Sequence, residues 1–382
     1  MASARFRRLA LTDFRSYASA ALDLDGRPVT LAGANGAGKT NILEAISLMG
    51  PGRGLRRARL DELPRAGGSG GWAVAARLDV GGDEVKLGVG AEARAPERRV
   101  CRINERAASG PSALSAHLRL LWLTPAQDRL FMEGAGERRR FLDRMALAHD
   151  PAHGGAANAY EKAMRQRQRL LEDGARDDAW LAALEGQMAE AGVAVAAARR
   201  DVAVLLASAD IGAKVGVGAF PDAEIALDGA LETALEHCPA ADVEEDYAER
   251  LLRQRRADRE AGRALMGPHR SDLIVSHRQK GQPARLCSTG EQKALLIGLV
   301  LANARALAER SGPTGGAPLV MLLDEIAAHL DADRRAALFD ILDDIGFQTF
   351  MTGTDQSLFT AWGDRAQSFA IEDGAAVEID NR

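Results

Sequence analysis

The sequence predicts an α/β fold that is split along the chain and carries a helical lobe between its two parts. A glycine-rich loop at 33–40 follows one short apolar segment, and an apolar run at 319–323, which ends in Asp324-Glu325, lies near the C-terminus. Between about 137 and 265 the apolar residues repeat at helical spacing instead. We therefore expect a β-rich first part of an α/β head over 1–136, a helical lobe over 137–265 and the second part of the head over 266–382.

The first part of the head contains short strands around one helix. The segment 29–31 is a strand that leads into the glycine-rich loop, and the apolar positions of 42–49 predict a helix after it. Apolar and polar residues alternate over 72–80 and again over 85–89, with Gly81-Gly82 between them, which predicts a hairpin. Residues 100–103 are suited to a further strand.

The lobe is predicted from one long helix and a return helix. Spacings of three and four separate Leu181, Leu184, Met188, Ala191, Val195, Ala198, Val202 and Leu205. This seam suits either a core-facing helix of a bundle or a minimal coiled coil, and we favour the bundle. A helix of about 25–30 residues is about 40 Å long, so the lobe is a stub rather than a long arm. The return helix is expected over 242–265.

The last part of the chain returns to alternating helices and strands. A helix is expected from residue 288, followed by a buried strand at 319–323, a helix over 333–345 and a strand over 347–351. A final hairpin turns at Asp373-Gly374 between strands at 369–371 and 377–379.

Composition narrows the class of protein. The 382 residues are 46% hydrophobic and 27% charged, as in ordinary globular proteins, and the formal net charge is −5. Nucleic-acid binding would therefore depend on local arginine clusters. The three cysteines, Cys101, Cys238 and Cys287, form no metal-binding pattern, and the basic N-terminus lacks the apolar core of a signal peptide. No apolar run is long enough to span a membrane, so a cytoplasmic protein is expected.

The glycine-rich loop has the complete pattern of a phosphate-binding P-loop. Its backbone N–H groups can surround a β-phosphate, Lys39 can reach the β- and γ-phosphates, and the Thr40 hydroxyl suits Mg²⁺. The sequence therefore indicates an ATP and Mg²⁺ site made of Gly33, Ala34, Asn35, Gly36, Ala37, Gly38, Lys39 and Thr40.

Two carboxylates end the apolar strand at 319–323. We expect this strand beside the P-loop strand, with Asp324 holding Mg²⁺ through water. Glu325 is then placed to orient or deprotonate the attacking water. The alternative is a pair of surface carboxylates at a strand end.

The segment 288–293, which we call the serine box, reads Ser-Thr-Gly-Glu-Gln-Lys and stands about 250 residues after the P-loop. Ser288 and Gly290 at a helix start offer a hydroxyl and backbone N–H groups to a γ-phosphate. Ser288 and Glu291 also have the spacing of an ordinary capping box. Together with a P-loop and an Asp-Glu strand end, the segment is typical of ABC-type ATPases, in which it completes the ATP site of a partner molecule.

Arginines gather at four places and could neutralise DNA phosphates, although solvated or ion-paired surfaces would look the same. The DNA-contact prediction is placed on Arg53, Arg56, Arg57, Arg138 and Arg139. The wider clusters are Arg5, Arg7 and Arg8; Arg53, Arg56, Arg57 and Arg59; Arg138, Arg139 and Arg140; and Arg253, Arg255 and Arg256.

Nearly the whole chain resembles the RecF family of bacterial recombination mediators, which are related to the SMC-type ATPases. The resemblance is carried by segments 11–17 (LTDFRSY), 41–46 (NILEAI), 137–143 (ERRRFLD), 267–273 (GPHRSDL) and 288–293 in this order. It implies a slow, DNA-stimulated ATPase that dimerises with ATP and binds double-stranded DNA near single-strand gaps. It further implies that RecR and RecO help load RecA where single-strand-binding protein blocks it, with roles in replication-fork maintenance and SOS induction.

The resemblance also implies roles for four further residues. Arg15 would lie near the nucleotide, and Asp331 would lie at the dimer interface. Gln127 would contact metal and water in a loop where the family usually has proline followed by two acidic residues. Thr352 stands at the switch position where ABC transporters carry histidine, which implies a weaker γ-phosphate sensor.

Three other functions are alternatives to a RecF-like role. A transporter's energising subunit usually has about a hundred residues between the P-loop and the serine box, whereas about 250 residues separate them here. A defence-type ATPase with a nuclease would need a carboxylate cluster after the ATPase motifs. A scaffold that binds ATP without useful hydrolysis is opposed by Glu325.

Overall fold

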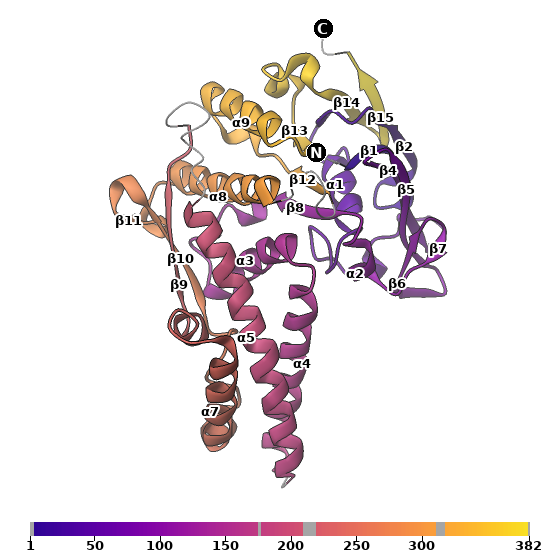
Figure 1. The fold of residues 1–382 in the computed structure, drawn as a ribbon. Coiled ribbons are helices and arrows are strands. Elements are labelled where there is room, and N and C mark those ends of the chain that lie inside the picture. The colour runs from indigo at the N-terminus through magenta and orange to yellow at the C-terminus, as the bar shows by residue number, and fades with distance from the viewer. Residues whose placement is uncertain (1–3, 175–176, 209–218, 311–317, 381–382) are drawn as a thin grey trace. The chain divides into compact units, whose positions relative to one another are not determined.

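The computed structural model describes residues 4–174, 177–208, 219–310 and 318–380 (Figure 1). These residues form two compact units. The first unit contains the described residues of 4–128, 219–220 and 300–380, and the second contains 129–174, 177–208 and 221–299. No helix among the described residues is long and apolar enough to cross a membrane.

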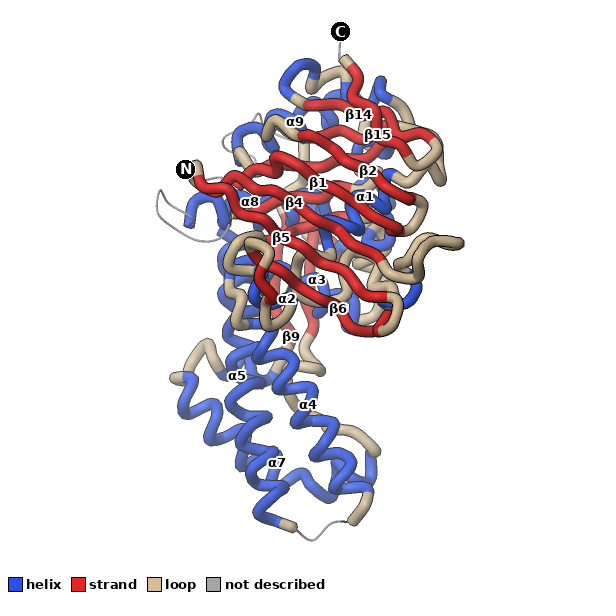
Figure 2. The backbone as a smooth tube through the Cα atoms, turned by 90° about the vertical axis from the view of Figure 1, so that its right-hand side faces the viewer, coloured by secondary structure: helices blue, strands red, loops and turns tan. Residues whose placement is uncertain are grey.

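The first unit contains an antiparallel sheet of six strands, ordered β2-β1-β4-β5-β6-β7 (Figure 2). The predicted hairpin is present, with Val74 opposite Val89 and Leu78 opposite Val85. Inward-facing positions of β4 are buried and outward-facing positions exposed, as a sheet with one packed face requires. The strands are β1 (Ala4–Phe14), β2 (Tyr17–Asp23), β4 (Trp72–Val80), β5 (Asp83–Glu92), β6 (Ala95–Ile103) and β7 (Arg106–Ala107).

A second sheet of this unit has the order β15-β14-β3-β13-β12-β8, and only β14 and β15 pair antiparallel. Its central strands β3, β13 and β12 are buried along their whole length, as expected of a parallel sheet covered on both faces. The strands are β3 (Val29–Ala32), β8 (Arg119–Leu123), β12 (Leu319–Leu323), β13 (Gln348–Gly353), β14 (Gln367–Glu372) and β15 (Ala375–Ile379).

One hydrophobic core joins both sheets to the P-loop helix α1 (Lys39–Ser47). The Phe6 ring of β1 meets the Phe350 ring of β13 edge to face, with centroids 5.4 Å apart. Ile42, Leu43 and Ile46 give α1 its buried face in the same core. The P-loop helix is therefore fixed from two sides. Two other helices of this unit are α2 (Pro111–Leu114) and α9 (Ala332–Ile345).

The second unit is mainly helical. The long helix α5 (Asp178–Ser208) packs against α4 (His153–Glu172) and α7 (Ala240–Ala261). Six of the eight predicted seam residues of α5 are buried, and Ala198 and Leu205 are partly buried. The structure thus favours the bundle over the coiled coil. The remaining helices are α3 (Ala135–His149) and the short α6 (Ala230–Ala234).

A small sheet, β11-β10-β9, belongs to the same unit and contains β9 (Ala223–Asp228), β10 (Asp272–His277) and β11 (Gln282–Pro283). Because β10 pairs with β9 and contacts α3, residues from 266 up to 299 group with the helices. Helix α8 (Thr289–Arg310) crosses the division between the units. The boundaries of the two compact units therefore differ from those of the three predicted segments.

Candidate functional site

The P-loop forms a tight turn between β3 and α1. Gly36 and Gly38 have φ angles of 85° and 111°, a region that side chains rarely adopt. A Cβ atom on Gly38 would also come within 2.7 Å of the Tyr17 hydroxyl oxygen. The Lys39 ammonium group donates to the carbonyl oxygens of Gly33 and Ala34, at 2.7 and 2.9 Å. The loop therefore has the shape and the cation that a phosphate group requires.

Thr40, Asp324 and Thr352 meet at the carboxyl edge of the parallel sheet. The Thr40 and Thr352 hydroxyl groups both donate to Asp324 Oδ1, at 2.9 and 2.8 Å. From the sequence we expected the strand before Asp324 to lie beside the P-loop strand. This prediction is wrong, because β13 lies between β3 and β12. Thr352, at the end of β13, therefore donates to the same carboxylate oxygen as the P-loop residue Thr40.

Glu325 follows in a strained backbone conformation. Its φ angle is 54°, which is uncommon for a residue other than glycine, and its N–H group donates to Thr352 Oγ1 at 2.9 Å. Burial lowers the pKa of Lys39, and the negative charges of Glu325 and Asp324 oppose this shift. Both carboxylates are therefore close enough to act on the P-loop lysine.

Replacing Thr352 with valine should impair ATP turnover while leaving the shape of the core unchanged. The hydroxyl is buried and makes the hydrogen bonds to Asp324 and Glu325 described above. Losing them should lower the free energy of unfolding by about 1–3 kcal/mol and lower turnover about tenfold. Thr352→Ser keeps the hydroxyl and is the matched control. Equal turnover of the valine variant and the wild type would show that Thr352 does not position the carboxylates.

Arg15 lies at the turn between β1 and β2, with a φ angle of 53°. Its guanidinium group donates to both carboxylate oxygens of Glu44, at 2.9 and 2.7 Å. Glu44 belongs to α1, is buried, and also accepts from Arg56 at 3.0 Å. Arg15 and Arg56 are thus both bound to the P-loop helix through the buried carboxylate of Glu44.

Gln127 lies in a short 3-10 turn directly after β8. The main chain of this region is next to Asp324, since the Asp324 N–H group donates to the Leu123 carbonyl oxygen at 2.9 Å. However, the Gln127 side-chain oxygen accepts from the N–H group of Thr124 at 3.1 Å. The oxygen that could bind a metal therefore makes a local capping bond here.

Ser288 and Gly290 belong to the second compact unit, whereas the P-loop belongs to the first. The capping-box reading of the sequence is realised: the Ser288 N–H and hydroxyl groups donate to Glu291 Oε2, at 3.0 and 2.9 Å. Hydrogen bonds from Lys280 and Ser288 lower the pKa of Glu291 to about 2. The box is thus intact at neutral pH. The cap is compatible with a nucleotide role, since it fixes the serine at the start of α8.

Asp331 caps the start of α9, where its side chain accepts from the Arg334 N–H group at 2.8 Å. The side chain is 60% exposed. It is therefore accessible to another molecule, although its capping role alone would explain an aspartate at this position.

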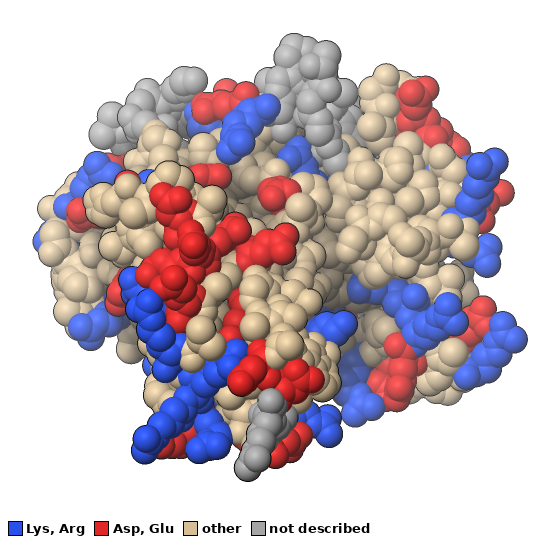
Figure 3. Space-filling view, turned by 60° about the horizontal axis from the view of Figure 1, so that its bottom comes forward, with Lys and Arg blue, Asp and Glu red and all other residues tan. Residues whose placement is uncertain are grey.

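Of the five predicted DNA-contact arginines, Arg56, Arg138 and Arg139 have partners among the described residues, whereas Arg53 and Arg57 form a second group. Arg138 forms a two-bond ion pair with Asp272, at 2.7 Å for each bond, and Arg139 donates to the Ser271 carbonyl oxygen at 2.7 Å. Arg53 and Arg57 are exposed and have no hydrogen bond or ion pair with another described residue. Figure 3 shows basic and acidic side chains interspersed on one face, so any DNA contact depends on local groups.

Replacing Arg138 with glutamine should affect stability. Its side chain and that of Asp272 are 16% and 19% exposed, so the variant leaves a largely buried carboxylate without its cation. We expect a loss of about 1–3 kcal/mol in the free energy of unfolding, measured with urea. Arg140→Gln, whose side chain is 44% exposed, is the control. If Arg138→Gln weakened DNA binding with unchanged stability, Arg138 would be a DNA contact instead.

Known proteins resemble this chain over nearly its whole length. The family model described as RecF/RecN/SMC N terminal domain matches residues 5–375. A curated Mesorhizobium japonicum protein named DNA replication and repair protein RecF is 54% identical over 375 residues, which is 98% of this chain and 97% of that protein. The chain belongs to the RecF family. A Brucella abortus protein of the same name is also 54% identical and covers 98% of this chain and 96% of its own length.

Solved structures confirm the predicted fold class, an α/β P-loop ATPase head split in sequence with a helical insertion. A structure described as the recombination mediator protein RecF with ATP has a TM-score of 0.84 at 23% identity and covers 99% of this chain and 98% of its own. An SMC head bound to a domain of ScpA has a TM-score of 0.52 at 16% identity over 98% of both chains. Membership in the RecF family also argues against the transporter and defence alternatives.

Sequence reasoning assigned Arg15 to the site but missed Glu44, Ser16 and Tyr17 as parts of it. Ser16 accepts from the Asn41 side chain at 2.9 Å, and the Tyr17 hydroxyl donates to the Gly38 carbonyl oxygen at 3.1 Å. The available signal was a single acidic residue, Glu44, within the apolar face of the helix that follows the P-loop. A buried carboxylate of this kind requires a cationic partner elsewhere in the chain.

Proposed function

We propose that this protein is a slow, DNA-stimulated ATPase of recombinational DNA repair, in which ATP controls dimerisation and DNA binding. The observation that carries the proposal is the convergence of Lys39, Thr40, Asp324 and Glu325 at one edge of the parallel sheet. Membership in the RecF family, whose curated members are named DNA replication and repair proteins, supports the same role. The products are ADP and phosphate.

The site suits Mg²⁺ because Thr40 and Asp324 offer hard oxygen ligands 2.9 Å apart at the end of the P-loop. Bound Mg²⁺ would neutralise developing charge on the phosphates. Glu325 accepts the proton of the attacking water, and Lys39 stabilises the γ-phosphate oxygens. Thr352 holds the main chain of Glu325, and Arg15 steadies the P-loop helix through Glu44. Gln127 would contact the metal and water if its side chain turned away from Thr124.

The complete site is proposed to need two chains. The head (1–136 and 266–382) supplies a P-loop on one molecule, and Ser288 and Gly290 of a second molecule cover the γ-phosphate. Asp331 lies at the interface between the two molecules, and 137–265 forms the lobe. The exposed side chain of Asp331 and the position of Ser288 at the start of α8, where it is hydrogen-bonded to Glu291, support this arrangement.

The ATP-bound dimer is proposed to bind double-stranded DNA near single-strand gaps, and hydrolysis releases it. With RecR and RecO it would help load RecA onto strands covered by single-strand-binding protein, and thereby support replication forks and SOS induction. We assign DNA contact first to Arg53 and Arg57, since Arg56, Arg138 and Arg139 already have partners within the chain.

The test is duplex binding measured by fluorescence anisotropy with ATP, with ADP and without nucleotide, over a series of salt concentrations. Binding should require ATP. The logarithm of the association constant should fall with the logarithm of the salt concentration, with a slope of about −0.9 per phosphate neutralised. Gapped duplex should raise the rate of ATP hydrolysis. A salt-independent affinity, or equal binding without ATP, would contradict the proposal.

A further inference from the structure

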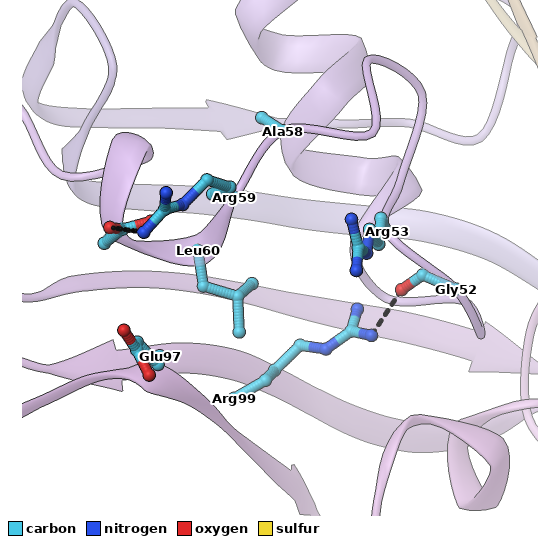
Figure 4. Close-up of a pocket in the computed structure, with 8 residues that line it drawn as sticks. Gly52, Arg53, Ala58, Arg59, Leu60, Glu97 and Arg99 are labelled. Atoms are coloured by element: carbon cyan, nitrogen blue, oxygen red, sulfur yellow. Dashed lines mark hydrogen bonds and ion pairs between the residues drawn. The ribbon is translucent and has the colours of Figure 1, made fainter. Parts of the chain in front are cut away.

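A cavity of about 260 Å³ opens in the first unit, just beyond the C-terminal end of the P-loop helix α1 (Figure 4). It lies between the segment 52–61 and strand β6, which supplies Glu97 and Arg99. One water occupies about 30 Å³ of liquid, so this cavity can accept a phosphate group with part of its hydration. Three arginines line it, namely Arg53, Arg59 and Arg99.

Arg99 is a half-buried cation that has no acidic partner among the described residues. Its guanidinium group donates to the carbonyl oxygens of Leu48 and Gly50, at 3.0 and 3.4 Å, and to that of Gly52. These carbonyl groups carry only partial negative charge. Within the described residues Arg99 has no ion pair, and burial lowers its pKa. An anion bound beside the Arg99 guanidinium group would therefore stabilise its positive charge.

The positive and negative groups of the cavity are separated. Arg59 is ion-paired with Asp61 at 2.8 Å, and the negative charge of Glu97 acts on Arg59 as well. Arg53, by contrast, is exposed and has no partner among the described residues. Figure 4 shows the Arg53 and Arg99 guanidinium groups near Gly52, away from Glu97. One end of the cavity is therefore cationic and lacks carboxylates.

We propose that this end binds one phosphodiester group of a DNA backbone, held between Arg53 and Arg99. Guanidinium groups offer paired N–H donors that match phosphate oxygens. A polymer fits better than a small anion, because exposed Arg57 follows in the same segment and could neutralise a further phosphate. The inference rests on the proposed DNA function and specifies its contact. Arg99 would then bond both the phosphate and the carbonyl oxygen of Leu48, the residue that caps the C-terminal end of the P-loop helix.

The test compares Arg53→Glu with Arg102→Glu by anisotropy of a labelled duplex in the presence of ATP. Arg102 is an exposed arginine of β6 that does not line the cavity. Arg53→Glu should weaken binding at least about tenfold and reduce the salt slope by about 0.9, whereas Arg102→Glu should change affinity less than about threefold. Arg53→Gln should lower DNA affinity less than Arg53→Glu does, with a similar change in the slope of the salt dependence. Unchanged thermal unfolding midpoints confirm that the variants fold.

The outcomes separate this inference from the proposed function. If the wild type fails to bind duplex with ATP, the DNA function itself is contradicted. If the wild type binds and the two glutamate variants weaken binding equally, DNA binding stands and the cavity is not its contact. A third arm adds inorganic phosphate alone. If phosphate raises the unfolding midpoint of the wild type but not of Arg53→Glu, and DNA affinity is unchanged in that variant, the site serves free phosphate and the proposal is overturned.

Discussion

Glu325→Gln should abolish most ATP hydrolysis and trap an ATP-bound dimer. The substitution keeps the size of the side chain but removes the group that accepts the proton of the attacking water. General-base catalysis typically contributes about 10²–10⁴-fold, and we expect a loss of this size in single-turnover hydrolysis. Since Thr40 and Lys39 are untouched, ATP should still bind, and gel filtration with ATP should show the dimer.

The matched control is Glu372→Gln, which alters an exposed carboxylate at the end of β14 in the same sheet. Its turnover and elution should equal those of the wild type. Unimpaired hydrolysis in Glu325→Gln would remove Glu325 from the mechanism. A monomer at every ATP concentration would contradict the sandwich dimer.

Arg167→Met should cause the largest loss of stability in the helical unit. Arg167 is 1% exposed and donates to Glu185, Asp258 and the Leu251 carbonyl oxygen, at 2.9, 2.6 and 2.7 Å. Glu185 retains Arg255 in the variant, but no other ion pair to the fully buried Asp258 exists within the described part of the chain. Removing one partner of a buried ion pair typically costs about 3–5 kcal/mol.

Urea unfolding followed by far-UV circular dichroism measures this change. The control is Arg165→Met on the same helix, where the ion pair with Glu161 is exposed and should contribute at most about 1 kcal/mol. Equal stability of the two variants would show that the buried network adds no stability to the lobe.

Elements with a strong local pattern were predictable from the sequence. The strand at 319–323 was found with its observed bounds, since five apolar residues between a loop and a carboxylate pair leave little choice of structure. The long helix α5 was likewise predicted from its seam. The order of strands was not predictable, because β13 enters between β3 and β12 from a later part of the chain.

The partners of charged residues could not be predicted for a similar reason. Arg138 and its partner Asp272 are 134 positions apart, and Arg15 and Glu44 are 29 apart. Charge clusters in a sequence cannot distinguish arginines that face solvent from arginines that fill such pairs. The sequence therefore predicted the P-loop and the Asp-Glu pair directly, whereas the supporting bonds of Thr352 and Glu44 required the structure.

The central claim, that one ATP site is built from two chains, can be tested by mixing two inactive variants. Lys39→Ala lacks a working P-loop but keeps Ser288, whereas Ser288→Arg lacks the serine box but keeps the P-loop. In a mixed dimer, one of the two sites combines the intact parts. Random pairing of equal amounts should therefore restore about a quarter of the wild-type turnover if the sites act independently. Turnover that remains at the level of the separate variants, although the mixed dimer forms, would contradict a shared site.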